Sequence, residues 1–175
     1  MTLTEVLMQR RSVRKFDGRA VPREVLEGLL ELTLTTAPSS KNTRSSRFMV
    51  IDKPELLAQI AEMRDFGSAF VAEAPCGVLV LGDTETDLWV DNAAISATVL
   101  QLAAEEAGLG SCWVHVNGRP RKVAEPDGAN AADYLRTLLP IPAGWAPLCF
   151  VALGYSANPH RPHSPQDDTD KVLWL

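Results

Sequence analysis

Apolar residues recur at helical spacing in several stretches of the chain, and residues that begin or end helices bound these stretches. Leu3, Val6 and Leu7 share one face of a predicted helix over residues 3–11, with Thr2 or Thr4 as its cap. Pro22 suits the first turn of a second helix, which extends to Thr36. The same reasoning predicts further helices over residues 54–63, 87–107 and 131–139.

The predicted helix over residues 87–107 is the longest, and its apolar residues occur on nearly every side. A helix of this kind is normally buried in a core or an interface. The glycines in Gly108–Gly110 are typical of the left-handed turn that ends a helix. We therefore expect a central, buried helix that stops abruptly before the next element.

Four shorter apolar runs predict strands over residues 47–52, 76–82, 111–116 and 146–155. The run 76–82 is almost uninterrupted, as in a central strand that is covered on both faces. We find no internal repeat and no linker. The pattern predicts an α+β fold, with residues 1–175 forming a single domain in which helices pack a small, mostly antiparallel sheet.

Composition and charge narrow the function. A chain of 175 residues with 46% hydrophobic residues can bury a real core, and its net charge of −5 argues against broad nucleic-acid binding. No stretch has the apolar length of a signal peptide or a membrane span, so we expect a cytoplasmic protein without a membrane partner. Three cysteines without paired spacing indicate buried, reduced thiols, and no metal site is expected.

Positive charge is concentrated in residues 9–16, QRRSVRKF, which contain four cations. Such a cluster is either a solvated helix end or a site for an anion, and spacing alone favours the solvated surface. An anion at a helix C-terminus needs side-chain cations, and the planar fork of arginine suits phosphate. Arg10 and Arg14 are four positions apart while Arg11 diverges. All three can meet one ligand only if the chain turns at Ser12–Val13.

Five blocks in a characteristic order make the chain similar to the nitroreductase family of flavin-dependent oxidoreductases. They are RRSVRKF (10–16), APSSKN (37–42), FVAEAPCGVLVLGD (70–83), AAEEAGLGSCWV (103–114) and LLPIPAGWAPLCFVALGY (138–155). The resemblance implies a homodimer of α+β chains with one FMN in each of two sites at the interface. It also implies that Arg10, Arg11 and Ser12 contact the FMN phosphate or ribityl chain. Arg14 then lies near the pyrimidine edge of the flavin, and Lys15 remains solvated.

Three further parts of the FMN site follow from the resemblance. The loop residues approach the cofactor from the other subunit, the backbone of the third strand runs along the flavin ring, and a basic residue in the tail contacts the phosphate. The loop residues are Pro38, Ser39, Ser40 and Asn42, the strand residues are Ser111, Cys112, Trp113 and Val114, and the tail residue is Arg161. The chain departs from the family at Arg44–Ser46, where many members have Gln-Pro-Trp.

Other polar residues are expected to have no chemical role. Cys112 is interpreted as a small packed residue, and His115 as a core or strand-edge histidine. His160 and His163 are expected at the surface, and the acidic pairs Glu105–Glu106 and Asp167–Asp168 in solvent. The apolar end of the tail, VLWL (172–175), is expected to dock on a partner subunit.

The resemblance implies a ping-pong oxidoreductase in which NADH or NADPH gives hydride to flavin N5. A quinone, nitro compound or activated alkene then takes the electrons, and no side chain acts as a catalytic acid, base or nucleophile. Two alternatives stay open. One is a specialised flavoenzyme of the same fold that dehalogenates, cleaves flavin or oxidises azolines. The other is a flavin-free or flavin-storing module that binds some phosphate ligand through its arginines.

Overall fold

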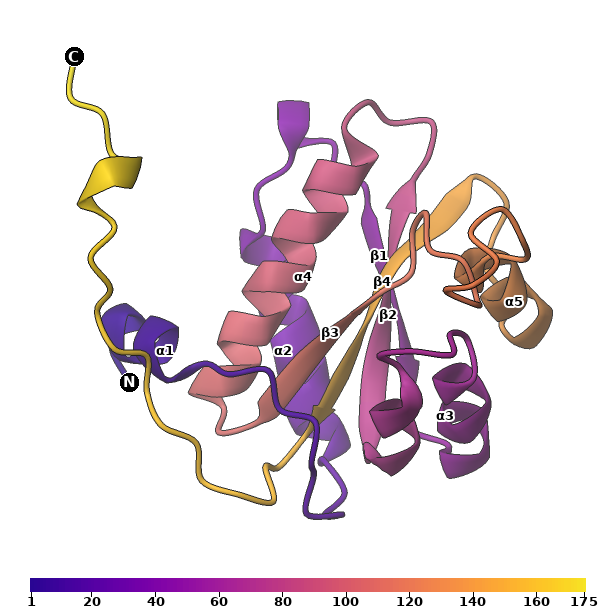
Figure 1. The fold of residues 1–175 in the computed structure, drawn as a ribbon, viewed down its shortest axis with the longest axis horizontal. Coiled ribbons are helices and arrows are strands. Elements are labelled where there is room, and N and C mark those ends of the chain that lie inside the picture. Colours follow the sequence, from indigo (N-terminus) through magenta and orange to yellow (C-terminus); the bar gives the residue numbers. More distant parts are fainter.

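The computed structural model describes residues 1–175, and its centre is a four-stranded sheet (Figure 1). The strands are β1 (Ser46–Ile51), β2 (Cys76–Asp83), β3 (Gly110–His115) and β4 (Trp145–Gly154). Their order in the sheet is β1-β2-β4-β3, and every neighbouring pair is antiparallel. The predicted α+β fold and its four strands are confirmed, and β3 forms one open edge of the sheet.

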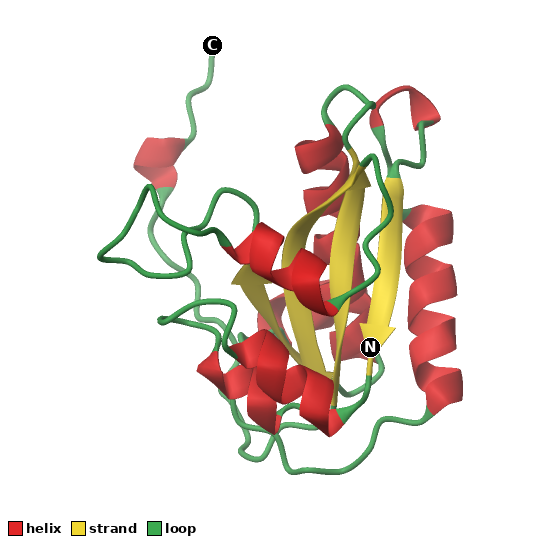
Figure 2. Cartoon of the chain, turned by 90° about the vertical axis from the view of Figure 1, so that its right-hand side faces the viewer, coloured by secondary structure: helices red, strands yellow, loops and turns green.

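Helices cover both faces of this sheet, as Figures 1 and 2 show. The helices α2 and α4 lie on one face, and α3 and α5 on the other; α1 lies beside the C-terminal end of α4. Their bounds are Leu3–Gln9 for α1, Arg23–Thr36 for α2, Pro54–Ala61 for α3, Trp89–Glu106 for α4 and Ala131–Leu138 for α5. Single turns of 3-10 helix occur at Ser40–Asn42, Ala69–Glu73 and Thr169–Lys171.

The apolar run in β2 feeds two separate cores. Val78 and Val80 face α2 and α4, whereas Leu79 and Leu81 face α3 and α5. Successive side chains of a strand point to opposite faces, so a strand covered on both faces must be apolar at every position. All four of these side chains are fully buried. This two-sided packing explains the uninterrupted run that the sequence showed.

The long helix α4 is buried against the sheet on one side only. Ala93, Ala97 and Ala104 pack in the core with Leu100, while Val90 and Ile95 are more than a third exposed. Gly108 follows the helix with φ +77°, so the predicted glycine cap is confirmed. Its outer side therefore carries exposed apolar side chains.

The bounds of α3, α4 and α5 differ from the predicted ranges by one or two residues, and two other helix ends differ for a structural reason. Helix α1 stops at Gln9 and not near Arg11, because Arg10 already adopts extended dihedrals (φ −51°, ψ 126°). Its N-terminus has the capping box that Thr2 and Glu5 form. Pro22 stands just before α2, as its N-cap, and not inside the first turn.

The tail after β4 runs back along α1 and then leaves the body of the molecule (Figure 1). Its apolar end, Val172–Leu175, is exposed, with Trp174 at 92%. No helix in the chain combines the length and the apolar character that crossing a membrane requires.

Candidate functional site

The basic segment Arg10–Phe16 leaves α1 and lies beside β3. Ser12 pairs with Ser111 in a parallel bridge, and the Val13 amide donates to the Ser111 carbonyl at 2.9 Å. The chain therefore changes from helix to extended backbone before Ser12. Because of this change, Arg11 and Arg14 point in directions that differ from those they would have in a continued helix.

A glycine in β3 makes this close approach possible. Val13 is buried, and a Cβ atom built on Gly110 would lie 2.7 Å from Val13 Cγ2. Any larger residue at 110 would push the basic segment away from the strand. Gly108 and Gly110 therefore have different structural roles. Gly108 ends α4, and Gly110 leaves space for the Val13 side chain.

A hollow of about 210 Å³ lies between the basic segment and the start of the tail. Arg11, Arg14 and Lys15 line it from the basic segment. No carboxylate lines it, although the chain as a whole is acidic. The remaining lining residues are Ser12, Val13, Ser156, Asn158, Pro159 and His160. Three cations, hydroxyl groups and an imidazole without an acid form a donor set that suits a phosphate.

The tail holds one of these arginines in place. Arg11 donates through Nε and Nη2 to the carbonyls of Arg161 and Pro162, each at 2.8 Å. The ring of His163 lies 3.0 Å from the Arg10 carbonyl, and its amide donates to Met8 at 2.7 Å. The two bonds from Arg11 use its Nε and Nη2, so its Nη1 is left to bind a ligand. Arg161 lies at the same end of the molecule, and its side chain is exposed.

Arg14 extends from the basic segment toward Phe70, whose ring centre is 5.9 Å from the guanidinium carbon. Burial raises the pKa of the Cys112 thiol, while Arg14, the Ser12 hydroxyl and Arg10 act in the opposite direction. The thiol therefore lies close to this part of the segment, but it stays protonated at neutral pH. Cys112 is buried, as expected for a packed residue.

The outer edge of β3 has backbone groups that pair with no neighbouring strand. The Ser111 carbonyl accepts from Val13, and the His115 carbonyl lies 3.5 Å from Arg64 Nη1. Trp113 lies between them and directs its N–H and C=O to the same open side, because alternate residues of a strand point alike. Its carbonyl also accepts from the Cys112 thiol at 3.7 Å. Cys112 and Val114 direct theirs to β4.

The side chains of Trp113 and His115 form a pair on this edge. Trp113 Nε1 donates to His115 Nδ1 at 3.3 Å, and the rings stack with centroids 6.1 Å apart. Burial lowers the pKa of His115, and the nearby cations Arg119 and Arg64 lower it further. A neutral imidazole accepts this hydrogen bond, so His115 is the strand-edge histidine that the sequence predicted.

The loop between α2 and β1 is fastened to the start of α4. Asn92 Oδ1 accepts from the Ser40 amide at 2.9 Å, and Asn92 Nδ2 donates to Ser45 Oγ at 2.9 Å. Ser96 Oγ donates to Ser46 Oγ at 2.8 Å. Where many family members have Gln-Pro-Trp, Ser45 and Ser46 thus anchor the loop by hydrogen bonds, while Arg44 is exposed with φ +50°.

This loop and the basic hollow lie at opposite ends of α4 (Figure 1). The loop contacts Asn92 in the first turn, whereas His160 of the hollow lies beside Glu105 in the last turn. Thirteen positions of α-helix span about 20 Å. Within one chain the structure therefore does not bring the loop residues together with the basic segment. The loop residues concerned are Pro38, Ser39, Ser40 and Asn42.

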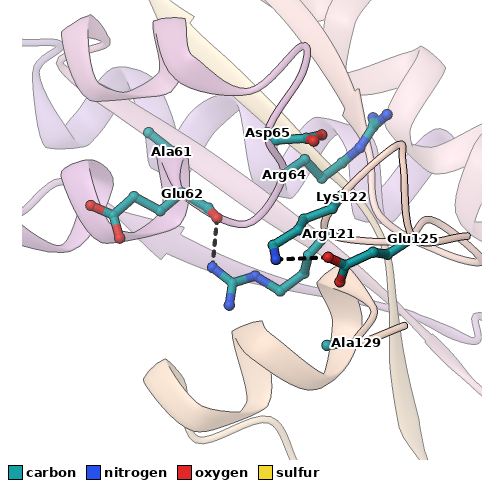
Figure 3. A pocket seen from close by; sticks show the side chains of 8 residues that line it. All are labelled: Ala61, Glu62, Arg64, Asp65, Arg121, Lys122, Glu125 and Ala129. Atoms are coloured by element: carbon teal, nitrogen blue, oxygen red, sulfur yellow. Dashed lines mark hydrogen bonds and ion pairs between the residues drawn. The ribbon is translucent and has the colours of Figure 1, made fainter. Parts of the chain in front are cut away.

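A larger hollow of about 590 Å³ lies between the end of α3 and the 119–130 loop (Figure 3). Only Lys122 and Glu125 among its charged side chains form an ion pair, at 2.9 Å. Asp65 accepts from the Val123 amide, and Arg121 Nη2 donates to the Glu62 carbonyl at 3.0 Å. The buried Nε atoms of Arg64 and Arg121 have no hydrogen-bond partner. Three cations and three carboxylates line it, so it has no net attraction for an anion. Nothing in the sequence predicted this hollow.

Several residues of the basic hollow were not predicted as site residues. Ser156, Asn158 and His160 come from the tail and meet the basic segment only in the fold. Lys15 is exposed, as expected, but it also lines the hollow. The prediction that Glu105 is solvated is wrong. Its side chain is only 10% exposed because the tail covers it, and His160 Nε2 lies 3.7 Å from its carboxylate.

Comparison with known proteins gives the same family as the sequence blocks. The chain matches the nitroreductase family over residues 7–65 and 61–155. A relative from Methanothermobacter thermautotrophicus, provisionally named NADH dehydrogenase/NAD(P)H nitroreductase, is 31% identical over 90% of this chain and 79% of its own length. The chain therefore belongs to the nitroreductase family, which is a family of oxidoreductases.

Solved structures agree with this assignment. An FMN-dependent nitroreductase from Clostridium difficile superposes with a TM-score of 0.88 at 34% identity, covering 97% of this chain and 96% of that one. A nitroreductase with bound FMN from Desulfitobacterium hafniense has a TM-score of 0.76 at 24% identity, over 99% of this chain and 97% of its own. At this lower identity, the second structure supports only the fold.

Proposed function

We propose that the chain is an FMN-dependent oxidoreductase that oxidises NADH or NADPH and reduces an electron-poor acceptor by a ping-pong sequence. The observation that carries this proposal is the acid-free basic hollow beside the open edge of β3. The hollow suits a phosphate, and the edge offers a flat group both a donor and an acceptor. The FMN-dependent relative at 34% identity supports FMN as the molecule that combines the two.

The chemical character of the residues around the basic hollow fits FMN. Arg11, Ser12 and Arg14 would hold the phosphate and ribityl chain, with Arg10 and Arg161 adding positive charge at the same end. The backbone of Trp113 would hydrogen-bond the polar edge of the ring. Arg14 also faces the strand, where a cation stabilises negative charge on a reduced ring. FMN, when bound, supplies hydride transfer through N5 between NAD(P)H and a quinone, nitro compound or similar acceptor.

We further propose that the site is completed by a second copy of the chain. The loop with Ser39, Ser40 and Asn42 lies at the far end of α4 and can reach the hollow only from another molecule. Exposed apolar side chains on three helices support such a dimer. They are Leu3 and Leu7 of α1, Leu32 and Leu34 of α2, and Val90 and Ile95 of α4. The exposed Val172–Leu175 end would dock on the same partner.

Residues 1–175 would act as one FMN-binding domain in the cytoplasm. All three cysteines are buried and unpaired, which suits a reducing compartment.

Purification tests the proposal. We expect a yellow protein that releases about one FMN per chain on heating. Anaerobic NADH or NADPH should bleach it, and a quinone or nitro compound should restore the colour. A colourless protein that takes up no added FMN would contradict the proposal and favour another phosphate ligand. A yellow protein that neither nucleotide bleaches would favour flavin storage or one of the specialised flavoenzymes.

A further inference from the structure

Glu105 is a carboxylate in an unfavourable place. It lies in the last turn of α4, where the helix dipole already carries partial negative charge, and its side chain is only 10% exposed. A buried charge is costly unless it has a partner. The only basic group within ion-pair distance is the ring of His160, whose Nε2 lies 3.7 Å from Oε1.

His160 also borders the basic hollow. It lines that hollow together with Arg11, Ser12 and Lys15, and its side chain is 30% exposed. The imidazole therefore stands between a buried carboxylate and the space that suits a phosphate. An imidazolium donates from both ring nitrogens, so it can serve the carboxylate with one and a phosphate oxygen with the other.

We propose that His160, oriented by Glu105, is a further phosphate-binding residue of the FMN site. This inference rests on the proposed function. Glu105 is a positioning residue, because it acts through the imidazole and not on the phosphate. The charged groups that face His160 are Glu105 from α4 and Arg11, Arg14 and Lys15 from the basic segment, with Arg161 next along the tail.

Riboflavin lacks the phosphate of FMN, so comparing the two ligands isolates the contact that His160 would make. Loss of a phosphate contact would weaken the binding of FMN alone, whereas a general disturbance of the fold would weaken the binding of both ligands.

The test is titration of the apoprotein with FMN and with riboflavin, followed by flavin fluorescence. For His160→Gln we expect FMN affinity to fall roughly tenfold, the size of one charge-assisted contact. Glu105→Gln should show a smaller loss of FMN affinity. Riboflavin should bind wild type and His160→Gln alike.

Two matched controls change a neighbouring residue of the same type. His163→Gln alters the other tail histidine, whose ring bonds the Arg10 carbonyl and does not line the hollow, and it should lower FMN affinity less than His160→Gln. Glu106→Gln alters the exposed neighbour of Glu105 and should leave FMN affinity unchanged. A His160→Gln variant that binds FMN like the wild type, or that loses riboflavin affinity equally, would overturn the inference. Wild type that binds no FMN would overturn the proposed function itself.

Discussion

The Val13 amide donates to the Ser111 carbonyl at 2.9 Å, and this bond joins the basic segment to the edge strand β3. Because of this bond, the basic segment that follows α1 forms one wall of the basic hollow. Arg11 and Arg14, which flank it in sequence, both line that hollow. The closeness of the two backbones depends on the missing side chain at Gly110.

Gly110→Ala should therefore displace the basic segment. The new Cβ would lie 2.7 Å from Val13 Cγ2, and overpacking of this kind costs about 1–3 kcal/mol. We expect lower thermal stability and weaker FMN binding, measured by thermal unfolding and fluorescence titration. Val13→Gly removes Cβ and both methyl groups, the three atoms that the new Cβ would meet at 2.7 to 2.9 Å, so the double variant should recover FMN affinity relative to Gly110→Ala alone. If the second change restored nothing, the contact between Val13 and Gly110 would not be the cause.

Gly28→Ala is the matched control for a glycine. No atom lies within 4 Å of a Cβ built at this position inside α2. Alanine favours helix by up to about 1 kcal/mol, so this variant should be slightly more stable and should bind FMN like the wild type.

Arg10→Ala and Arg11→Ala should each weaken FMN binding by roughly 1.5–3 kcal/mol, the scale of a lost hydrogen bond to a charged group. Arg11→Ala should also free the tail, because Arg11 holds the carbonyls of Arg161 and Pro162. Limited proteolysis would report that second effect, which Arg10→Ala should lack. Arg19→Ala removes an exposed cation paired with Asp17 and should change neither result. Unchanged FMN binding in both test variants would refute the assignment of Arg10 and Arg11 to the phosphate site.

Alkaline pH should destabilise the fold through Cys76. Burial raises the pKa of this thiol to about 12, from an ordinary value of 9.0. The thiol ionises at lower pH in the unfolded chain than in the folded one. Its contribution is therefore complete below pH 9 and is lost toward pH 12, at roughly 1.4 kcal/mol per pH unit. Urea unfolding at several pH values should give a shallower decline for Cys76→Ala; parallel declines would contradict the assignment.

Ile95→Glu should break the proposed dimer. Ile95 is exposed on the outer side of α4, where a charge is tolerated in a monomer but not inside an apolar interface. We expect sedimentation to show a monomer that no longer retains FMN. Val123→Glu makes the same apolar-to-acidic change at an exposed position of the 119–130 loop, away from α4, and should leave the dimer intact; an equal loss there would show that the loss of an apolar contact on α4 is not responsible. A wild-type monomer loaded with flavin would contradict the interface.

The sequence predicted most of the fold because its elements depend on local patterns. The apolar run of β2 and the alanine-rich face of α4 each encode burial that the structure confirms. The end of α1 was misplaced because the pairing of Ser12 with Ser111, a contact distant in sequence, competes with further helical turns. No local pattern reports such a contact.

The candidate site was less predictable for the same reason. Arginines in a row are visible in a sequence, but the tail residues Asn158 and His160 face them only after the chain has folded. The sequence suggested that Glu105 and Glu106 are both solvated. In the structure the tail lies against Glu105, which is buried, while Glu106 is exposed. The residues of the basic hollow come from two segments that are distant in sequence, and no periodic pattern of the sequence connects them.

Mixing two variants tests most directly whether the FMN site is built from two copies. Arg11→Glu places a negative charge in the basic hollow, and Asn42→Asp places one in the loop without disturbing its positive φ. Each variant alone should lose FMN. In a mixed dimer one site carries both changes and the other carries neither. Unfolding and refolding them together should therefore restore about a quarter of the wild-type FMN content. No recovery in the mixture would contradict a shared site.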